Sequence, residues 1–324
     1  MKLATHADGA KDGALLVVSK DLTHAVRANA ALTLQDALDQ WGDVAPELER
    51  QYSELNRGAA RSASALSDFT LAAAMPRSYQ FLDASAFLAH NHILADAWGF
   101  ERRTEDDAPL MYQGLSDTFL PPSGEVAFRS IDDEIDFEAE FAVVLDETPL
   151  GVRPDAARAH IRLITMINDW SLRRFGPIEM QGGFGFLHAK PPCSMAAIAV
   201  TPDELGAAWR DAKVCARLHI RRNGEPFGHP DGAAMSYDFG RLIAHAAITR
   251  DLCTGTILGS GTVSNVDAAS VGSGCIAERR ALEGLSKSPQ PTPYLQFGER
   301  VRLEAFDANG RSLFGAIDQV VVRR

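Results

Sequence analysis

The amino-acid sequence predicts an α+β protein rich in β-structure, with a small N-terminal α/β domain ahead of a larger region of mixed strands. From Pro76 onward, short apolar segments follow one another without the regular alternation of strands and helices that a doubly wound fold requires. Asn223-Gly224 and Asn309-Gly310 stand between such segments, and these dipeptides favour tight β-turns. By contrast, apolar residues at helical spacing stand out in residues 33–58.

The N-terminal domain is expected to hold one hairpin and two helices. Residues 1–20 read as two apolar runs around a polar turn that contains glycines, the pattern of a β-hairpin. A helix is expected to follow Thr33, a residue type that caps helix N-termini. A second helix is expected over residues 45–58, with Pro46 in its first turn.

The Ala/Ser-rich residues 59–67 are expected to link this domain, residues 1–72, to a second domain, residues 73–324. The predicted strands of the second domain are Glu125–Arg129, Phe137–Leu145, Leu163–Asn168, Ala196–Val200, Val214–Arg221, Thr256–Leu258, Val301–Phe306 and Ile317–Val322. Its predicted helices are Arg158–Ile161, Pro202–Trp209 and Phe239–Arg250.

Composition and charge limit the classes of function. The 324 residues are 46% hydrophobic and 23% charged, which is ordinary for a globular protein. The formal net charge is -11 and no run of basic residues is present, so a nucleic-acid partner is not expected. The four cysteines form no C-x-x-C pair, which disfavours a zinc knuckle or a disulfide framework. No stretch approaches the ~18 apolar residues of a membrane span, and no apolar signal core is seen, so we expect a cytoplasmic protein without a membrane partner.

Residues 135–145, I-D-F-E-A-E-F-A-V-V-L, place Glu138 and Glu140 in an otherwise apolar, strand-forming run. Residues i and i+2 of a strand point to one face, so two like charges would be held side by side. A hard divalent cation relieves their repulsion by taking both carboxylates as ligands. The alternative is an ordinary polar face with one glutamate solvated at a strand edge, and the pair alone does not decide between the two.

Asp83 and His90 would share one face if their segment is helical, because they are two helical turns apart. A histidine at this spacing can act as a general base beside a metal site. The alternative is a histidine on a helix face with an ordinary hydrogen-bond partner.

Three further side chains stand where packing alone explains them poorly. Tyr112 precedes a Gln-Gly pair and could reach a ligand oxygen, or form the single hydrogen bond of a buried tyrosine. Asp169 ends an apolar strand, where a carboxylate needs a partner, so it is a candidate metal ligand. Alternatively, Asn168 forms a turn there and Asp169 caps the next segment. Lys190 follows a stretch of glycines and aromatic residues.

Residues 259–262, G-S-G-T, offer backbone N–H groups and a hydroxyl that could bind a carboxylate or oxyanion, with Gly261 and Thr262 as candidate contacts. The segment lacks the G-K-[S/T] of a Walker loop. The chain also lacks a G-x-S-x-G elbow, so a serine hydrolase is disfavoured.

Taken together, these segments resemble the fumarylacetoacetate hydrolase family from Pro76 to the C-terminus. The family's D-x6-H, E-x-E and N-D-W-S motifs occur in the same order, as Asp83 to His90, Glu138 with Glu140, and Asn168 to Ser171. By resemblance the family's substrate tyrosine is Tyr112, its lysine Lys190, its G-T-[I/V]-S segment Gly261 to Ser264, and the glutamate that partners its histidine Glu278. The resemblance implies a C-terminal domain folded as a mixed β-sandwich roll.

The resemblance also implies a metal site and a mechanism. The metal ligands would be Asp83, Glu138, Glu140 and Asp169, an all-oxygen set suited to Mg²⁺, Ca²⁺ or Mn²⁺. The family's hydrolases cleave the carbon–carbon bond between two carbonyls of a 1,3-diketo acid. His90, oriented by Glu278, would take a proton from water, and Lys190 with Tyr112 would stabilise the oxyanion.

The sequence departs from the family pattern in three places. The first domain is shorter than the SH3-like barrel of the longest members and matches it poorly. The arginine that would bind the substrate carboxylate falls on Arg102 or Arg103. A glutamine that contacts substrate in the family's hydrolases would fall near Phe175 or Gly176, where this chain has none. The substrate is therefore less well specified than the reaction.

The leading expectation is hydrolysis of fumarylacetoacetate to fumarate and acetoacetate, the last step of tyrosine and homogentisate breakdown. The alternatives are an acylpyruvate hydrolase, for example of fumarylpyruvate, and a decarboxylase or tautomerase of oxaloacetate-like acids. The D-x6-H histidine favours hydrolysis, since members with the other activities often lack it. A non-catalytic metal-binding relative would have lost a site residue, and none is missing. Because the family forms homodimers, we expect one here.

Overall fold

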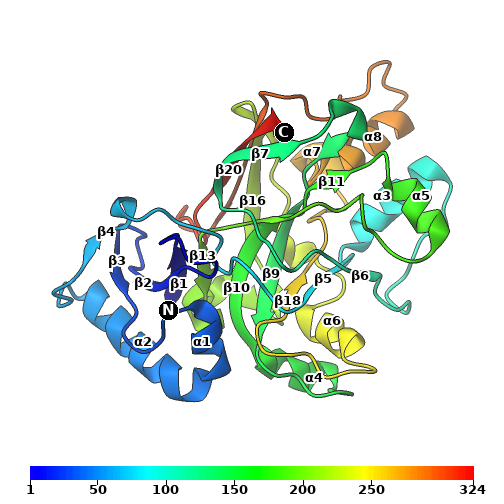
Figure 1. Cartoon of the computed structure of the whole chain (residues 1–324). Helices are drawn as coiled ribbons and strands as arrows, with labels where there is room; N and C mark the ends of the chain where they lie inside the picture. The colour runs from blue at the N-terminus through cyan, green and yellow to red at the C-terminus, as the bar shows by residue number, and fades with distance from the viewer.

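The computed structural model describes all residues, 1–324, as two main β-sheets with helices beside them (Figure 1). The larger sheet has eleven strands and the smaller has five. Buried side chains from both sheets belong to one continuous hydrophobic cluster, so the sheets pack against each other. The predicted β-rich α+β class is confirmed.

The larger sheet runs through both the N-terminal and the C-terminal regions. Its strands follow the order β4-β3-β2-β1-β13-β10-β9-β18-β5-β6, with β12 paired to β10. Only β18 and β5 are parallel neighbours. The bounds are β1 (Lys2–His6), β2 (Ala14–Val18), β3 (His24–Arg27), β4 (Ser64–Ala65), β5 (Phe81–Ala84), β6 (Met111–Gln113), β9 (Ala139–Leu145), β10 (Ile161–Asn168), β12 (Ser194–Met195), β13 (Ile198–Val200) and β18 (Ile257–Gly259). Pairing of β1 with β13 makes this sheet continuous.

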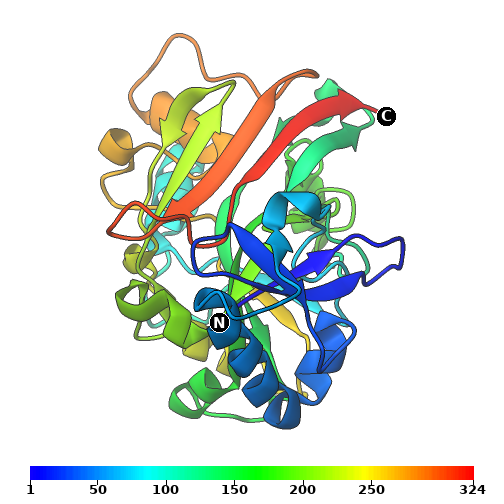
Figure 2. The same ribbon diagram turned by 90° about the vertical axis from the view of Figure 1, so that its left-hand side faces the viewer.

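The smaller sheet has the order β17-β16-β19-β20-β7. Its strands are β7 (Ser123–Phe128), β16 (Arg217–Arg222), β17 (Glu225–Gly228), β19 (Arg300–Phe306) and β20 (Ile317–Arg323). Side chains alternate between buried and exposed along β16, as expected for a sheet with one face on the core. Figure 2 shows these strands in front, with no helix over their outer face. Two short pairs complete the strands: β8 (Ile135–Asp136) with β11 (Ser171–Leu172), and β14 (Trp209–Arg210) with β15 (Lys213–Val214).

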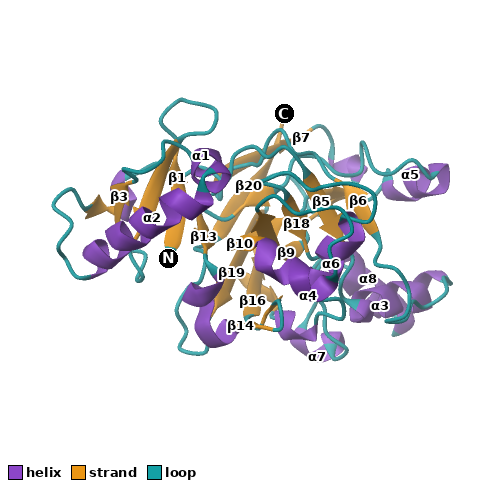
Figure 3. Cartoon of the chain, turned by 90° about the horizontal axis from the view of Figure 1, so that it is seen from below, coloured by secondary structure: helices purple, strands orange, loops and turns teal.

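The helices lie at two ends of the molecule. Their bounds are α1 (Leu34–Asp39), α2 (Trp41–Asn56), α3 (Leu88–Trp98), α4 (Pro154–Ala157), α5 (Gly176–Gly182), α6 (Phe239–Ala246), α7 (Ala268–Val271) and α8 (Ile276–Leu285). Figure 3 shows α1 and α2 beside the N-terminal strands, and α3, α6 and α8 at the other end. Helix α3 packs against α8, and α4 packs against α6.

In the N-terminal region the predicted hairpin and the predicted first helix are confirmed. Strands β1 and β2 pair in antiparallel register within residues 1–20. Thr33 caps α1: its Oγ1 accepts the Asp36 N–H at 3.1 Å, and its own N–H donates to the Asp36 carboxylate at 3.1 Å. This reciprocal capping box fixes the start of the helix.

Two N-terminal predictions need correction. Helix α2 begins at Trp41 rather than at residue 45, so Pro46 lies inside the helix instead of in its first turn. The N–H groups of Asp43 and Val44 both bond to Gln40 O, which starts the helix before the proline. The segment 59–67, expected to be a linker, contributes β4, whose Ala65 pairs with His24 of β3.

In the C-terminal region each predicted strand overlaps an observed strand. Asn223-Gly224 joins β16 to β17 with positive φ at both residues, as a type I′ turn requires. The helix predicted at Arg158–Ile161 is wrong, because a 3₁₀ turn at Arg158–His160 leads directly into β10. Pro202–Ala208 is also 3₁₀ and is broken at Gly206, whose φ of 51° is not helical.

The predicted helix at Phe239–Arg250 is confirmed as α6 but ends at Ala246. Helix α8 was not predicted. None of the helices combines the length and the apolar character needed to cross a lipid bilayer.

Candidate active site

Three buried carboxylates, Asp83, Glu140 and Asp169, form a group that we call the acid cluster. Asp83 is on β5, Glu140 is on β9, and Asp169 directly follows β10. Strand β9 pairs with β10 on one side and with β18 on the other, and β18 pairs with β5. The sheet therefore brings the three together, and one oxygen from each lies within 4.8 Å of the others.

The G-S-G-T segment contacts the acid cluster through its backbone. The N–H of Gly261 donates to Glu140 Oε2 at 3.1 Å and to Asp83 Oδ1 at 3.3 Å. A Cβ at Gly259 would lie 2.2 Å from Asp83 Oδ1, so only glycine leaves room for this carboxylate. Thr262 is buried next to Gly261 but makes no side-chain hydrogen bond to the acids.

The acid cluster holds more negative charge than its own hydrogen bonds balance. Burial, and then the charge of Asp169, raises the pKa of Asp83 to about 7. Burial and the charges of Asp83 and Asp169 raise the pKa of Glu140 well above its usual range. Glu140 Oε1 is buried without a hydrogen-bond partner. These residues fit a hard divalent cation, which would balance the charge and occupy the free oxygen.

Asp169 differs from the other two acids because three side chains donate to it. The Tyr112 hydroxyl and the Lys190 ammonium group donate to Oδ2, and the Cys193 thiol donates to Oδ1 at 2.8 Å. Burial, and then the charge of Asp169, raises the pKa of Cys193 well above its usual range, which keeps the thiol protonated. The sequence places Cys193 after two prolines, and this context gave no signal for its role.

Glu138 lies beside the acid cluster but is balanced by two cations. Its Oε2 accepts from Lys190 Nζ at 2.5 Å, and its Oε1 accepts from Arg173 Nη2 at 2.7 Å. Burial alone would raise the pKa of Glu138, but Lys190 and Arg173 outweigh burial and hold that pKa below its usual range. Lys190 links the two groups, because its ammonium group contacts both Glu138 and Asp169.

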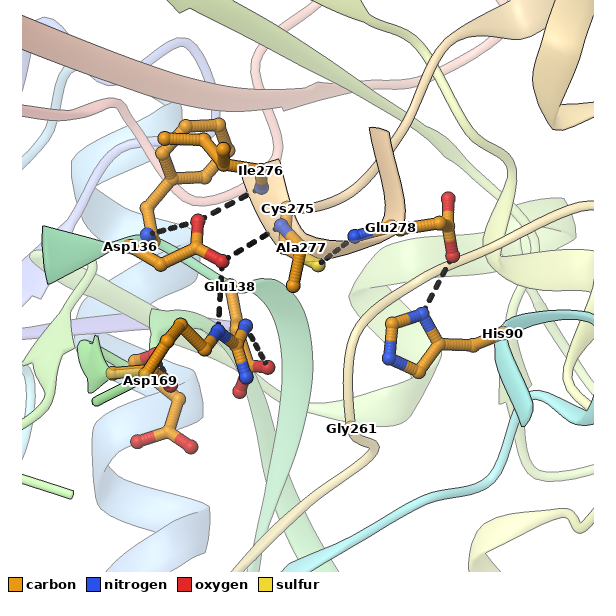
Figure 4. Close-up of polar contacts among 12 residues, drawn as sticks. His90, Asp136, Glu138, Asp169, Gly261, Cys275, Ile276, Ala277 and Glu278 are labelled. Carbon is orange, nitrogen blue, oxygen red and sulfur yellow. Dashed lines mark hydrogen bonds and ion pairs between the residues drawn. The ribbon is translucent and has the colours of Figure 1, made fainter. Parts of the chain in front are cut away.

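Sequence reasoning missed Arg173 and Asp136, which complete this ion-paired group. Arg173 Nε donates to Asp136 Oδ2 at 2.9 Å. Figure 4 shows the Asp136 carboxylate at the start of α8, where it accepts the N–H groups of Ile276 and Ala277. A signal was present in the sequence, because Asp136, Glu138 and Glu140 alternate along one stretch.

His90 and Glu278 form a second buried pair. His90 Nδ1 lies 2.6 Å from Glu278 Oε2, and the two residues come from the first turns of α3 and α8. Figure 4 shows the other ring nitrogen pointing away from Glu278, with Gly261 between His90 and Asp169 in this view. Glu278 Oε1 is buried without a hydrogen-bond partner. Asp83 and His90 would share a helical face only if their segment were helical throughout, and it is not, because Asp83 lies on strand β5 and only His90 lies on α3.

Neither candidate arginine for a substrate carboxylate is brought to the acid cluster. Arg102 is 57% exposed and pairs with Asp96, with Nε 2.7 Å from Oδ1. Arg103 Nη2 donates to Ala108 O at 2.6 Å. Both arginines lie in the segment that follows α3 and are held by neighbours in sequence.

Comparison with protein families gives two matches that together cover nearly the whole chain. Residues 81–322 match the family described as "Fumarylacetoacetate (FAA) hydrolase C-terminal". Residues 1–77 match the family described as "Fumarylacetoacetase N-terminal domain 2". No curated protein matches the sequence.

Solved structures with the same fold include three named enzymes. A 5-carboxymethyl-2-hydroxymuconate delta-isomerase from Mycobacterium smegmatis is 16% identical, with a TM-score of 0.63 over 100% of this chain and 99% of the other. Maleylpyruvate hydrolase from Sphingobium sp. SYK-6, in complex with Mn²⁺ and pyruvate, is 16% identical, with a TM-score of 0.67 over 100% and 99%. Fumarylpyruvate hydrolase from Pseudomonas aeruginosa, in complex with Mn²⁺ and pyruvate, is 14% identical, with a TM-score of 0.57 over 77% and 92%. At these identities the similarity establishes the fold.

Proposed function

The chain belongs to the fumarylacetoacetate hydrolase family, and we propose that it hydrolyses the carbon–carbon bond between the two carbonyls of a 1,3-diketo acid. The observation that carries this proposal is the His90–Glu278 pair in the same structure as a buried acid cluster. The pair can accept a proton from water, and the cluster can hold a cation. Hydrolysis of a diketone uses both functions.

The cation site in this proposal is built from Asp83, Glu140 and Asp169. A bound Mg²⁺, Ca²⁺ or Mn²⁺ would supply a Lewis acid for the substrate's carbonyl oxygens. Mn²⁺ is the first ion to test, because two hydrolases of this fold contain it. Glu138 would join as a fourth ligand if Lys190 turned from it towards the substrate.

The protein's own residues can then carry out the proton transfers. Glu278 accepts the Nδ1 hydrogen of His90, which leaves Nε2 free to take a proton from water. The hydroxide adds to the carbonyl carbon, and the bond between that carbon and its neighbour breaks, with its electron pair leaving as an enolate. His90 returns the proton to the enolate carbon that has left, and the products are a carboxylic acid and a ketone. Lys190 and Tyr112 would donate hydrogen bonds to the oxyanion.

The His90–Glu278 pair favours hydrolysis over the isomerase activity named for one protein of the same fold. Isomerisation of a keto acid moves a proton within the substrate and consumes no water. A histidine held by a carboxylate is the arrangement expected where a water molecule must be deprotonated.

For the substrate, fumarylacetoacetate remains our first candidate and an acylpyruvate the second. The second is favoured by the maleylpyruvate and fumarylpyruvate hydrolases of the same fold, whose structures contain pyruvate. Purified protein with Mn²⁺ should be given fumarylacetoacetate, fumarylpyruvate and oxaloacetate in parallel, while the ultraviolet absorbance of the diketone is followed. Loss of the diketone signal supports hydrolysis and identifies the better substrate. Decarboxylation of oxaloacetate without cleavage of either diketo acid would exclude the proposed hydrolysis.

His90→Ala is the matched variant for the proposed base. We expect kcat to fall roughly 10²- to 10⁴-fold, the range for loss of a general base. Mn²⁺ affinity measured by calorimetry should stay unchanged, since His90 is not among the metal ligands. A variant that loses Mn²⁺ binding would count against the base role.

A further inference from the structure

We infer that Asp136 is a positioning residue that holds the two halves of the active site in a fixed relation. Its carboxylate contacts the start of α8, which carries Glu278 (Figure 4). The same carboxylate contacts the guanidinium group of Arg173, which in turn contacts Glu138. This inference rests on the proposed function, because that function gives Glu278 its task. Asp136 makes no hydrogen bond to the acid cluster or to His90 and acts through its neighbours.

The contacts with α8 are made at its first two residues. Asp136 Oδ1 accepts the Ile276 N–H at 2.8 Å, and Oδ2 accepts the Ala277 N–H at 2.9 Å. The first N–H groups of a helix lack partners within the helix and carry partial positive charge, so a carboxylate is favoured there. The next residue is Glu278, whose side chain pairs with His90. Asp136 thus anchors the turn from which Glu278 reaches the histidine.

The contact with Arg173 leads to the other half of the site. Arg173 uses Nε for Asp136 and Nη2 for Glu138, so its planar group is held by two carboxylates. Glu138 in turn holds Lys190, whose ammonium group reaches Asp169 of the acid cluster. An unbroken series of charged contacts therefore runs from α8 to the acid cluster.

The burial of Asp136 makes these contacts obligatory. The residue is 0% exposed, so bulk solvent does not reach its carboxylate to replace a lost partner. A backbone bridge between Glu138 and Cys275 already joins the two segments. That bridge is made at one residue, whereas the carboxylate binds two consecutive N–H groups and so fixes the direction in which α8 leaves.

Asp136→Asn tests this role with little change of shape. The amide keeps one oxygen acceptor but turns its NH₂ group towards another N–H donor, so at least one contact is lost. Asp238 provides a matched control. It caps α6, accepting from Gly240 N–H at 2.8 Å and Arg158 Nη2 at 3.0 Å, and α6 carries none of the proposed catalytic residues.

The first measurement is steady-state kinetics with the better diketo acid and Mn²⁺. For Asp136→Asn we expect kcat to fall roughly 10- to 100-fold, as for groups that orient catalytic residues. KM and the Mn²⁺ dissociation constant should stay within error of the wild-type values. Asp238→Asn should keep the wild-type kcat. Equal losses in the two variants, or a wild-type kcat in Asp136→Asn, would overturn the inference.

The second measurement needs no substrate. The His90 Nδ1 hydrogen, held by Glu278, should give a low-field proton resonance in the NMR spectrum, and Glu278→Gln should remove it. We expect Asp136→Asn to remove or shift this resonance and Asp238→Asn to keep it. If Asp136→Asn does not fold, Asp136→Ser, which leaves space for a water molecule, takes its place with the same expected results.

The two measurements separate the possible failures. If the wild-type protein cleaves no diketo acid but Asp136→Asn alters the resonance, the proposed function fails and the positioning role stands. If the wild-type protein is active and the Asp136 variants keep both its kcat and the resonance, the positioning role fails.

Discussion

Glu138 and Glu140 are two residues apart on one strand-forming stretch, yet their surroundings are opposite. Glu140 lies between two other buried acids, and burial with their charges raises its pKa. Glu138 lies between Lys190 and Arg173, which overcome its burial and lower its pKa. The difference shows that spacing along one stretch does not decide which acids come together. Cations from distant segments balance Glu138 and so decide which acid stays charged without a metal.

Loss of metal binding is the largest effect that this comparison predicts. Glu140→Gln replaces one carboxylate ligand of the acid cluster by a neutral amide, so we expect Mn²⁺ affinity to fall by more than about 100-fold and activity with it. Glu138→Gln should weaken Mn²⁺ binding much less, because its carboxylate is already balanced by two cations. Calorimetric titration of both variants is the measurement. Equal losses would mean that Glu138 is a full fourth ligand.

The two substitutions should also differ in their effect on stability without metal. Glu138→Gln leaves Lys190 and Arg173 buried with one partner fewer, which should cost about 3–5 kcal/mol of unfolding free energy. Glu140→Gln replaces an acid whose raised pKa already favours the neutral form without metal, so the variant should be about as stable as the wild type. Urea unfolding in EDTA measures both, and a destabilised Glu140→Gln would contradict the comparison.

Added metal should stabilise the wild-type protein by binding to the acid cluster, whose negative charge no cation fully balances. At a free Mn²⁺ concentration of 100 times the dissociation constant, the expected gain is about 2.7 kcal/mol. Glu140→Gln should show little of this gain at the same Mn²⁺ concentration. Thermal or urea unfolding with Mn²⁺ and with EDTA measures this gain in unfolding free energy. An equal gain in Glu140→Gln would mean that the ion binds outside the acid cluster.

The comparison also predicts a pH dependence of the metal-free protein. The pKa of Asp83 is raised to about 7 in the folded state. The unfolded value is about 3.9, so between these values the native state holds a proton that the unfolded chain has released. This group's contribution to stability therefore falls as the pH rises from about 4 to about 7, by at most about 1.4 kcal/mol per pH unit. In EDTA, the wild-type curve minus the Asp83→Asn curve should show this slope, and a flat difference would exclude it.

The sequence predicted strands better than helices, and the reasons are physical. Long strands show their pattern directly, β9 as a mostly apolar run and β19 as an alternation of polar and apolar residues. Helix α8 was missed because Glu278 stands on its buried face and interrupts the apolar stripe. Strand β5 has only four residues, one of them Asp83, so the segment was considered as part of a helix with His90.

Resemblance to the family and motif spacing located most of the candidate site, while its ion pairs required the folded structure. Asp83, Glu140 and Asp169 were identified from their motifs, as was the pairing of His90 with Glu278. The charges on Glu138 depend on Arg173 and Lys190, which are 35 and 52 residues away in sequence. Arg102 follows His90 closely in sequence but is held at the surface by Asp96.

Pairing of β1 with β13 has a consequence for the order in which the protein is assembled. The hairpin of β1 and β2 is local and can form as soon as it leaves the ribosome, since synthesis proceeds from the N-terminus. The other edge of β1 can pair only after β13 (Ile198–Val200) has been synthesised, almost two hundred residues later. Until then this edge of the hairpin has unpaired backbone groups, a surface to which other chains can add. Pairing of β1 with β13 should therefore be the slow stage of folding. It should also depend on protein concentration, because other chains compete for the unpaired edge until then.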